Sequence, residues 1–393
     1  MWLEVAVPYY RTVGEVPKKR HTQFRGPDGG LYAEELMGAE GFSGASALLY
    51  HRHAPTDLVA ADTWQLPEEA TVANQPLMPR HFKAHKLDAG AADVVTGRQL
   101  LLANSDVRLS YVAADADSPL YRNARGDECA YIESGRAVVE TVFGPLAVGA
   151  GDYVVLPRST THRWRPSEPL RALIIEGSGH IGPPKRYLSA TGQFLEVAPY
   201  CERDLRGPDS LPEPADSGEA EVFVRHDGGG TRYLFSHHPF DVVGWDGCLY
   251  PYAFNIADFE PLVGRVHLPP PVHQTFEGPG FVVCSFCPRP FDFDPAAVPV
   301  PYNHANVDSD EVLFYVGGDF MSRRGAGIEV GSLTLHPSGF VHGPQPGSVE
   351  ASLGQTGTEE WAVMVDTFRP LQLGPAALAT EDTGYAWTWH RSQ

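Results

Sequence analysis

Three side chains in the C-terminal third of the chain have the types and spacing that suit a metal ion. His304 precedes Glu311, and His342 ends a second segment in which Gly331 and Pro337 mark turns. Two imidazoles and one carboxylate on one side of an ion leave its other positions open, as in the facial triad of non-haem iron(II) oxygenases. We therefore expect a metal site, with iron(II) as its metal. Ligand type alone leaves manganese and nickel open.

A small antiparallel barrel would bring these three side chains together. Residues two apart in a strand share a face, so His304 and Asn306 are expected to point the same way. Glu311 starts a β-rich run that ends at Gly317, and a turn after Pro337 lets the chain reverse before its last histidine. Side chains from neighbouring barrel strands converge at the barrel mouth, where ligands commonly bind.

The rest of the sequence also favours β-structure. Helical periodicity is scarce, whereas short runs rich in β-branched and aromatic residues recur between Gly, Pro, Asn and Asp. These runs cover residues 136–143, 152–157, 172–176, 221–224, 311–316 and 360–365. The pattern predicts an all-β sandwich or barrel.

A weak internal repeat relates the two halves of the chain. Each copy has a glutamate, six residues and a glycine, followed by Gly-x5-Pro-x-Ser/Gly-x2-His. The first copy runs from Glu128 to His162, and the second from Glu311 to His342. Only the second has a histidine ahead of its glutamate. We therefore expect two duplicated β-rich halves, with only the C-terminal half competent to bind metal.

A length of 393 residues suits two domains of moderate size. Residues 201–220 are polar and rich in Pro and Gly, so they are the expected linker. Residues 1–200 would form an N-terminal β-rich domain that carries the degenerate repeat. Residues 221–393 would form the C-terminal catalytic cupin domain.

Composition narrows the partners. A net charge of −19 argues against nucleic acid and anionic membrane surfaces, which select basic patches. The sequence lacks a membrane-length apolar run and the order of a signal peptide. Five cysteines suit a reducing cytoplasm, where we expect the protein to work. Cys284 and Cys287 form a lone CxxC within an apparent buried strand, which favours a structural role.

Several other charged residues could serve the site. His336 precedes the turn before the last ligand and could act from behind the metal. His273 lies in a proline-rich turn and could act as a general acid or base, although a surface loop is an equal alternative. Arg323 and Arg324 could bind a substrate carboxylate, but the sequence favours an exposed hairpin tip for them.

Longer strings around these residues resemble a known family. Residues 29–38, 241–252, 301–306 and 335–344 are similar to homogentisate 1,2-dioxygenase, a family of the cupin superfamily, in a short bacterial-type form. The similarity reaches nearly the whole chain. It implies an iron(II) enzyme of tyrosine and phenylalanine catabolism with a bicupin-like double-stranded β-helix fold, in which two jelly-roll halves are joined and only the C-terminal one is metal-competent. Such an enzyme opens the ring of homogentisate with both atoms of dioxygen retained, and gives maleylacetoacetate.

The resemblance also implies roles for particular residues. The metal ligands would be His304, Glu311 and His342. His336 would line the site, and His273 would handle the substrate hydroxyl, although His267 lies close enough to be the residue meant. The residues expected around the substrate are Tyr302, Asn306 and Phe320. A homo-oligomer, either a trimer or a hexamer, is also implied.

The sequence departs from the long family members at a few positions. The gap between Asn306 and Glu311 is one residue longer, so Asp310 competes as the carboxylate ligand, although we prefer Glu311. Phe320 stands where the long forms have a tyrosine, and Asn303 replaces an aromatic residue. These changes concern the substrate pocket. A related dioxygenase for another hydroquinone or phenolic acid is therefore the alternative, followed by a non-catalytic metal-binding or sugar-binding cupin.

Overall fold

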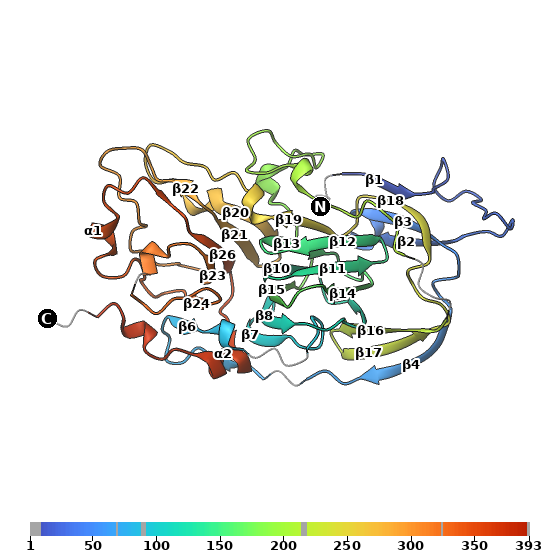
Figure 1. Ribbon diagram of the computed structural model, residues 1–393, viewed down its shortest axis with the longest axis horizontal. Coiled ribbons are helices and arrows are strands. Elements are labelled where there is room, and N and C mark those ends of the chain that lie inside the picture. Colours follow the sequence, from blue (N-terminus) through green and yellow to red (C-terminus); the bar gives the residue numbers. More distant parts are fainter. Residues whose placement is uncertain (1–8, 68–69, 88–91, 214–217, 324, 391–393) are drawn as a thin grey trace. The chain divides into compact units, whose positions relative to one another are not determined.

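The computed structural model describes residues 9–67, 70–87, 92–213, 218–323 and 325–390. Short strands dominate it, and its two α-helices span only five and six residues (Figure 1). The expected all-β class is confirmed. The chain divides into two compact units. Unit 1 comprises Met1–Glu68, Ala89–Arg98 and Val112–Asn255, and unit 2 comprises Glu69–Asp88, Gln99–Tyr111 and Ile256–Gln393.

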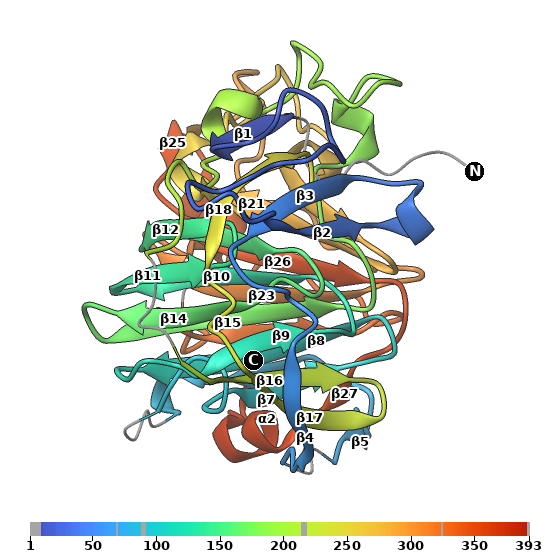
Figure 2. The same ribbon diagram turned by 90° about the vertical axis from the view of Figure 1, so that its right-hand side faces the viewer.

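Unit 1 contains three groups of paired strands. The first has the order β19 (Tyr252–Asn255), β13 (Asp152–Leu156), β10 (Glu128–Ser134), β15 (Leu170–Gly177). The second has the order β12 (Gly144–Gly149), β11 (Arg136–Thr141), β14 (His162–Pro166), β9 (Leu120–Asn123), β16 (Ala220–His226), β17 (Gly229–Phe235), β4 (Leu58–Trp64). The third has the order β1 (Arg11–Gly14), β18 (Val242–Gly247), β3 (Ser46–His51), β2 (Ala33–Gly38). Figure 2 shows β12, β11 and β14 side by side. Three short 3-10 helices are η1 (Glu40–Phe42), η3 (Lys185–Tyr187) and η4 (Glu202–Asp204).

The core of unit 1 lies between its first two sheets. Alternate residues such as Ala130 and Ile132 on β10 point inward and meet Val139 on β11 and Trp164 on β14. A period of two is what a strand with one buried face requires. Trp164 is fully buried, and truncation of such a side chain typically costs about 3–5 kcal/mol. Two sheets packed face to face around one core form the predicted jelly roll.

Unit 2 is built around one six-stranded sheet. Its order is β20 (Gln274–Gly278), β21 (Phe281–Phe286), β26 (Trp361–Thr367), β23 (Asp310–Gly317), β24 (Leu333–His336), β6 (Arg80–Phe82). Smaller pairings join β22 (Arg289–Pro290) to β25 (Gly357–Thr358), β27 (Gln372–Leu373) to β5 (Val72–Ala73) and β7 (Gln99–Ala103), and β7 to the start of β8 (Val107–Ala114). The helices are α1 (Ser348–Ser352), α2 (Pro375–Thr380), η2 (Ala84–Lys86), η5 (Ile256–Asp258), η6 (Pro270–His273), η7 (Met321–Arg323) and η8 (Tyr385–Trp387).

The strand register reproduces the sequence repeat. In each unit, a glutamate at the start of a central strand faces one residue on either neighbouring strand. The pairs are Glu128 with Leu156 and Glu176 in unit 1, and Glu311 with His336 and Asp366 in unit 2. The two units are therefore copies of one jelly-roll plan, as the bicupin-like prediction requires.

The expected linker, residues 201–220, is grouped with unit 1 in the structure. Arg206 forms an antiparallel bridge with Ala253, and its side chain contacts Asp152 at 2.6 Å. Residues 214–217 lie outside the described residues. The division between the units falls instead after Asn255, because β19 pairs with β13 and therefore stays with unit 1. No helix in the described ranges is long and apolar enough to cross a membrane.

Candidate metal centre

The three predicted ligands of unit 2 come together at one end of its sheet. Glu311 is the second residue of β23. His304 and His342 lie outside the strands, in an isolated antiparallel bridge where each backbone N–H donates to the other's carbonyl, at 2.8 and 2.9 Å. His304 is thus placed by a single bridge rather than by the strand we expected. One ligand atom from each of the three residues lies within 4.8 Å of the other two.

Backbone carbonyls orient both imidazoles. Nδ1 of His304 is 3.1 Å from the carbonyl oxygen of Tyr302, and Nδ1 of His342 is 3.2 Å from that of Phe340. A carbonyl accepts only from a protonated nitrogen, so Nδ1 carries a proton in both rings, and Nε2 is the nitrogen left to bind a metal. These Nε2 atoms lie 3.5 and 3.3 Å from the two carboxylate oxygens of Glu311.

This donor set fits a divalent metal. The Nε2 of His342 is buried and has no hydrogen bond. Burial opposes ionisation of Glu311, but the three surrounding histidines hold its pKa well below the usual range. A bound metal would replace any proton on the two Nε2 atoms, so that two nitrogen lone pairs and one carboxylate would face one cation. Among the described residues, these three form the group of His, Cys, Asp or Glu side chains whose ligand atoms lie close enough together to hold one metal ion.

His336 supports the carboxylate. Burial lowers its pKa to about 3, so the ring is neutral. Its Nδ1 donates to Oε1 of Glu311 at 2.9 Å, and its Nε2 accepts from the hydroxyl of Tyr385 at 3.0 Å. His336 is fully buried and is not one of the three grouped ligands, so its role is to hold the carboxylate of Glu311 in position. Tyr385 was missed by sequence reasoning, because it comes from η8 near the end of the chain and belongs to no spaced motif.

Asp310, the competing carboxylate, has a different role. Its two oxygens accept the backbone N–H groups of Ser338 and Leu371, at 2.9 and 2.8 Å. In unit 1, Asp127 accepts the N–H groups of Arg158 and Ile181 in the same way, at 2.7 and 2.9 Å. Each aspartate therefore ties down the turn and the strand end beside its glutamate.

Asp366 is a second residue that sequence reasoning missed. It faces Glu311 across β26 and β23, and its Oδ1 is buried without a hydrogen bond. Burial, together with the charge of Glu311, raises its pKa to about 8. The signal that could have found it is the repeat, because Glu176 has the corresponding place in unit 1.

The prediction that Arg323 lies at an exposed hairpin tip is wrong, because the residue is only 6% exposed. Its Nη1 donates to the carbonyl of Gly343, next to His342, and its guanidinium lies 5.8 Å from the ring of Trp389. η7 folds inward, and the C-terminal segment covers it. No ion pair joins Arg323 to a carboxylate of the described residues, and its Nε has no hydrogen bond. Arg324 lies outside the described residues.

The two candidate acid–base histidines have different surroundings. The His273 ring lies 4.7 Å from that of Phe286, and burial lowers its pKa to about 3. The His267 ring lies 5.2 Å from Tyr302, whose ring is 6.3 Å from His304. His267 and Tyr302 also line a cavity of about 410 Å³. The structure therefore connects His267 to the metal ligands through Tyr302 and places His273 in a separate contact.

Phe320 and Asn306, the other residues expected around the substrate, lie close to the ligands in the sequence. The ring of Phe320 contacts Tyr315, with centroids 5.0 Å apart. The carbonyl of Asn306 accepts the backbone N–H of Gly339 in the turn before His342. In the part of the chain that the structure describes, the side chain of Asn306 makes no hydrogen bond.

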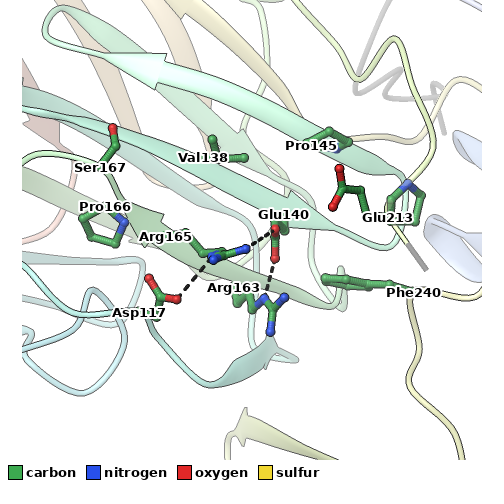
Figure 3. Close-up of a pocket in the computed structure, with 11 residues that line it drawn as sticks. Asp117, Val138, Glu140, Pro145, Arg163, Arg165, Pro166, Ser167, Glu213 and Phe240 are labelled. Atoms are coloured by element: carbon green, nitrogen blue, oxygen red, sulfur yellow. Dashed lines mark hydrogen bonds and ion pairs between the residues drawn. The ribbon is translucent and has the colours of Figure 1, made fainter. Parts of the chain in front are cut away.

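Another cavity, of about 500 Å³, lies in unit 1 on the outer side of β11 and β14 (Figure 3). Arg163 and Arg165 point toward Glu140, with which both form ion pairs, and Arg165 also contacts Asp117 at 3.2 Å. Paired surface charges of this kind contribute little to stability or binding. The residues that line this cavity include no histidine, and the arginines pair with two of its carboxylates, Glu140 and Asp117.

The duplicated jelly roll defines the protein as a cupin. A family model described as homogentisate 1,2-dioxygenase N-terminal matches residues 63–256. Across the full chain, a Saccharolobus solfataricus protein described as "Putative dioxygenase" is 40% identical over 392 residues, or 98% of this chain and 100% of the relative. The chain belongs to the homogentisate 1,2-dioxygenase family and is a cupin dioxygenase.

Two other matches have lower identity to this chain. The homogentisate 1,2-dioxygenase of Emericella nidulans is 26% identical over 263 residues, which is 62% of this chain and 56% of that enzyme. The match thus spans just over half of the longer relative. A solved cupin 2 conserved barrel protein from Leptotrichia buccalis is 9% identical and covers 76% of this chain and 100% of that one, with a TM-score of 0.33. That score is too low to support an argument.

Proposed function

We propose that this protein is an iron(II)-dependent dioxygenase that cleaves the ring of homogentisate to give maleylacetoacetate. The observation that carries the proposal is the set of three acceptor groups, on His304, Glu311 and His342, that face one point in a member of this family. In this role the protein would work in the cytoplasm as a homo-oligomer, either a trimer or a hexamer.

Iron held by these three residues would supply open coordination positions for an aromatic substrate and dioxygen. The protein's own contribution is to hold the ligands still. The His304–His342 bridge sets the separation of the two imidazoles, and the carbonyls of Tyr302 and Phe340 set their rotation. His336 keeps the carboxylate of Glu311 in place.

Arg323 is the group we assign to charge balance with an acidic substrate. It is a buried cation beside the ligand segment, and no described carboxylate pairs with it. A buried unpaired charge is costly, so a substrate carboxylate that approached it would be stabilised. A lysine would keep the charge but lose the planar donor fork. Arg323→Lys should therefore raise KM for homogentisate less than Arg323→Met does.

His267 is the better-placed histidine to take a proton from the substrate hydroxyl. It lines the cavity beside Tyr302, whereas His273 packs on Phe286. A general base must come within hydrogen-bond reach of the proton it removes. His267→Asn should lower kcat strongly, and His273→Asn should act mainly on stability. The reverse result would return the role to His273.

A second candidate function is ring cleavage of a different hydroquinone or phenolic acid. Phe320 favours it, because a ring without a hydroxyl cannot hydrogen bond to a polar group on the substrate. A site built without that donor would prefer a substrate that lacks the matching acceptor.

One experiment separates these functions. The protein is loaded with iron(II) under anaerobic conditions and then given homogentisate in air. Oxygen uptake with the absorbance of an unsaturated diketo acid supports the proposal. Uptake with another hydroquinone, but not with homogentisate, supports the second function. Metal binding with no uptake on any hydroquinone or phenolic acid would mean a non-catalytic cupin.

A further inference from the structure

In unit 1 the residue that corresponds to Glu311 is Glu128, and it forms an ion pair with an arginine, Arg98. Glu128 is 2% exposed, and Arg98 meets it with two parallel bonds, Nη1 to Oε1 and Nη2 to Oε2, each 2.8 Å long. The Arg98 side chain is only 5% exposed. A bidentate pair of this kind has a fixed geometry and is stronger than a neutral hydrogen bond.

Other polar groups complete a cradle around this pair. Arg98 Nη1 lies 3.4 Å from Glu176, the residue that faces Glu128 across β15. Asn123 Nδ2 donates to Glu128 and to the same carboxylate, at 2.8 and 3.3 Å. The guanidinium also lies 5.3 Å from the ring of Tyr121. Two buried carboxylates are thus held around Arg98, and Arg225 also contacts Glu176, at 3.2 Å.

The histidine of this repeat keeps the orientation of a ligand. His162 Nδ1 lies 3.0 Å from the carbonyl of Thr160, just as His342 is held by Phe340. Its Nε2 is buried and has no hydrogen bond. The imidazole is therefore oriented as in unit 2, although no metal-binding group in the described part of unit 1 includes it.

The charges explain why the two units differ. A buried carboxylate needs a cation at short range, because desolvation makes the isolated ion costly. In unit 1 that cation is a side chain. In unit 2, the basic side chains that lie within ion-pair distance of Glu311 in the described residues are His304, His336 and His342.

We propose that Arg98 is a built-in cation that takes, in unit 1, the place of the metal ion in unit 2. Unit 1 then keeps the cupin arrangement of strands and carboxylates without binding metal. The proposal rests on the proposed metal binding of unit 2, but it does not depend on which metal or substrate that site takes.

The first test is metal stoichiometry. Mn²⁺ binding is measured by calorimetry on the full chain and on Glu311→Ala, which removes a ligand of unit 2 only. We expect the variant to bind no Mn²⁺. Residual binding that disappears when Glu128→Gln is added would place a metal in unit 1 and overturn the proposal.

The second test removes the cation. Arg98→Ala should lower the melting temperature by about 5–10 °C, since it leaves the buried carboxylate of Glu128 without its arginine, whereas Glu176 keeps Arg225. Methylguanidinium at non-denaturing concentration should restore part of the loss. Arg98→Ala with Glu128→Gln should be more stable than the single variant and insensitive to methylguanidinium. Arg163→Ala, which removes a surface ion pair of the same unit, is the matched control. Neither methylguanidinium nor the added Glu128→Gln substitution should raise its melting temperature.

A single variant that melts like the wild type would overturn the proposal, as would a loss that neither methylguanidinium nor the second substitution relieves. If Arg98→Ala does not fold, the comparison rests on the double variant against Glu128→Gln alone. Glu128→Gln leaves Arg98 buried with only the longer contact to Glu176, at 3.4 Å, so it should melt lower than the double variant. The opposite order would contradict the assigned role.

Discussion

Asp310 and Glu311 are neighbours in the sequence with opposite tasks. Successive residues of a strand point to opposite faces, so β23 directs Glu311 toward the histidines and Asp310 toward the backbone N–H groups of Ser338 and Leu371. Charge type alone could not separate them. The face on which each side chain lies makes one a candidate ligand and the other a structural tie.

We expect Glu311→Ala to abolish metal binding while the protein stays folded, because it removes one of the three acceptors and a buried charge. Asp310→Ala should keep metal binding but lose roughly 2–4 kcal/mol of unfolding free energy, since two buried N–H groups lose a charged acceptor. Metal content and denaturant unfolding of both variants provide the measurement. Loss of metal from Asp310→Ala, with retention by Glu311→Ala, would reverse the assignment.

Tyr385 contacts the candidate metal ligands only through His336. Its hydroxyl donates to His336, whose other nitrogen donates to Glu311. This chain fixes the tautomer of His336 and therefore the position of the carboxylate. Outer groups of this type tune metal affinity without touching the ion.

Tyr385→Phe should weaken metal binding by about 10-fold, as loss of such partners typically does. The ring remains to fill the core, so the melting temperature of the metal-free protein should change little. Calorimetric titration with Mn²⁺ measures the affinity. An unchanged dissociation constant would show that His336 holds Glu311 without help from the tyrosine.

At the scale of elements, tight turns set where the strands end. Gly318 follows β23 with φ +81, and a side chain there would overlap the carbonyl oxygen of Glu359. Gly339, in the turn before His342, has φ +80 but open space around it. Its counterpart in unit 1 is Ser159, which adopts φ 67 with a side chain present. The two glycines are thus required for different reasons.

Gly339→Ala should cost only about 1–2 kcal/mol, the usual penalty for a left-handed conformation in an L-residue. Gly318→Ala should cost clearly more, because the backbone of a neighbouring segment must also move. Thermal unfolding of the two variants, side by side, gives the comparison. Equal shifts would show that the segment around Glu359 yields easily.

At the scale of the molecule, one buried histidine joins distant parts of unit 1. His51 on β3 contacts Asp241 at 2.7 Å and Glu35 at 3.1 Å. Burial opposes its charge, but both carboxylates raise the pKa of His51 to about 9. His53 also contacts Asp241, at 2.9 Å, and the charge of Arg122 acts on Glu35.

This pairing predicts how stability depends on pH. The folded pKa of His51 is about 9, above its ordinary value of 6.5, so its contribution is fully present below pH 6.5 and is lost as pH rises through 9. Between these values the unfolding free energy should fall by at most about 1.4 kcal/mol per pH unit. Burial opposes ionisation of Asp241 and Glu35, but hydrogen bonds with His51 lower both pKa values. Their contributions are therefore lost only at acid pH.

Melting temperatures from pH 6 to 10 provide the measurement. The wild type should lose stability across this range, and His51→Gln should be less stable at pH 6 and respond less to pH. A parallel decline in both proteins would assign the pH dependence to other groups.

Much of the fold and part of the site could be read from local patterns. Short runs of β-branched and aromatic residues between turn residues predicted the strands, and the spacing of glycine, proline and histidine predicted two copies of one unit. Glu128 and His162 were recognised as a copy without a leading histidine. These features are local, because a strand or a turn depends on residues close together in the chain.

The tertiary structure decided what depends on distant contacts. The sequence could not reveal that Tyr385 meets His336, that Arg98 neutralises Glu128, or that Arg323 lies buried beside Gly343. Each of these contacts joins separate segments, and its energy arises from removing charge and polar groups from water. The sequence by itself determined which acceptor groups the protein carries. The fold determined that the carboxylates of unit 1 face an arginine, and that the acceptors of unit 2 meet at a candidate metal site.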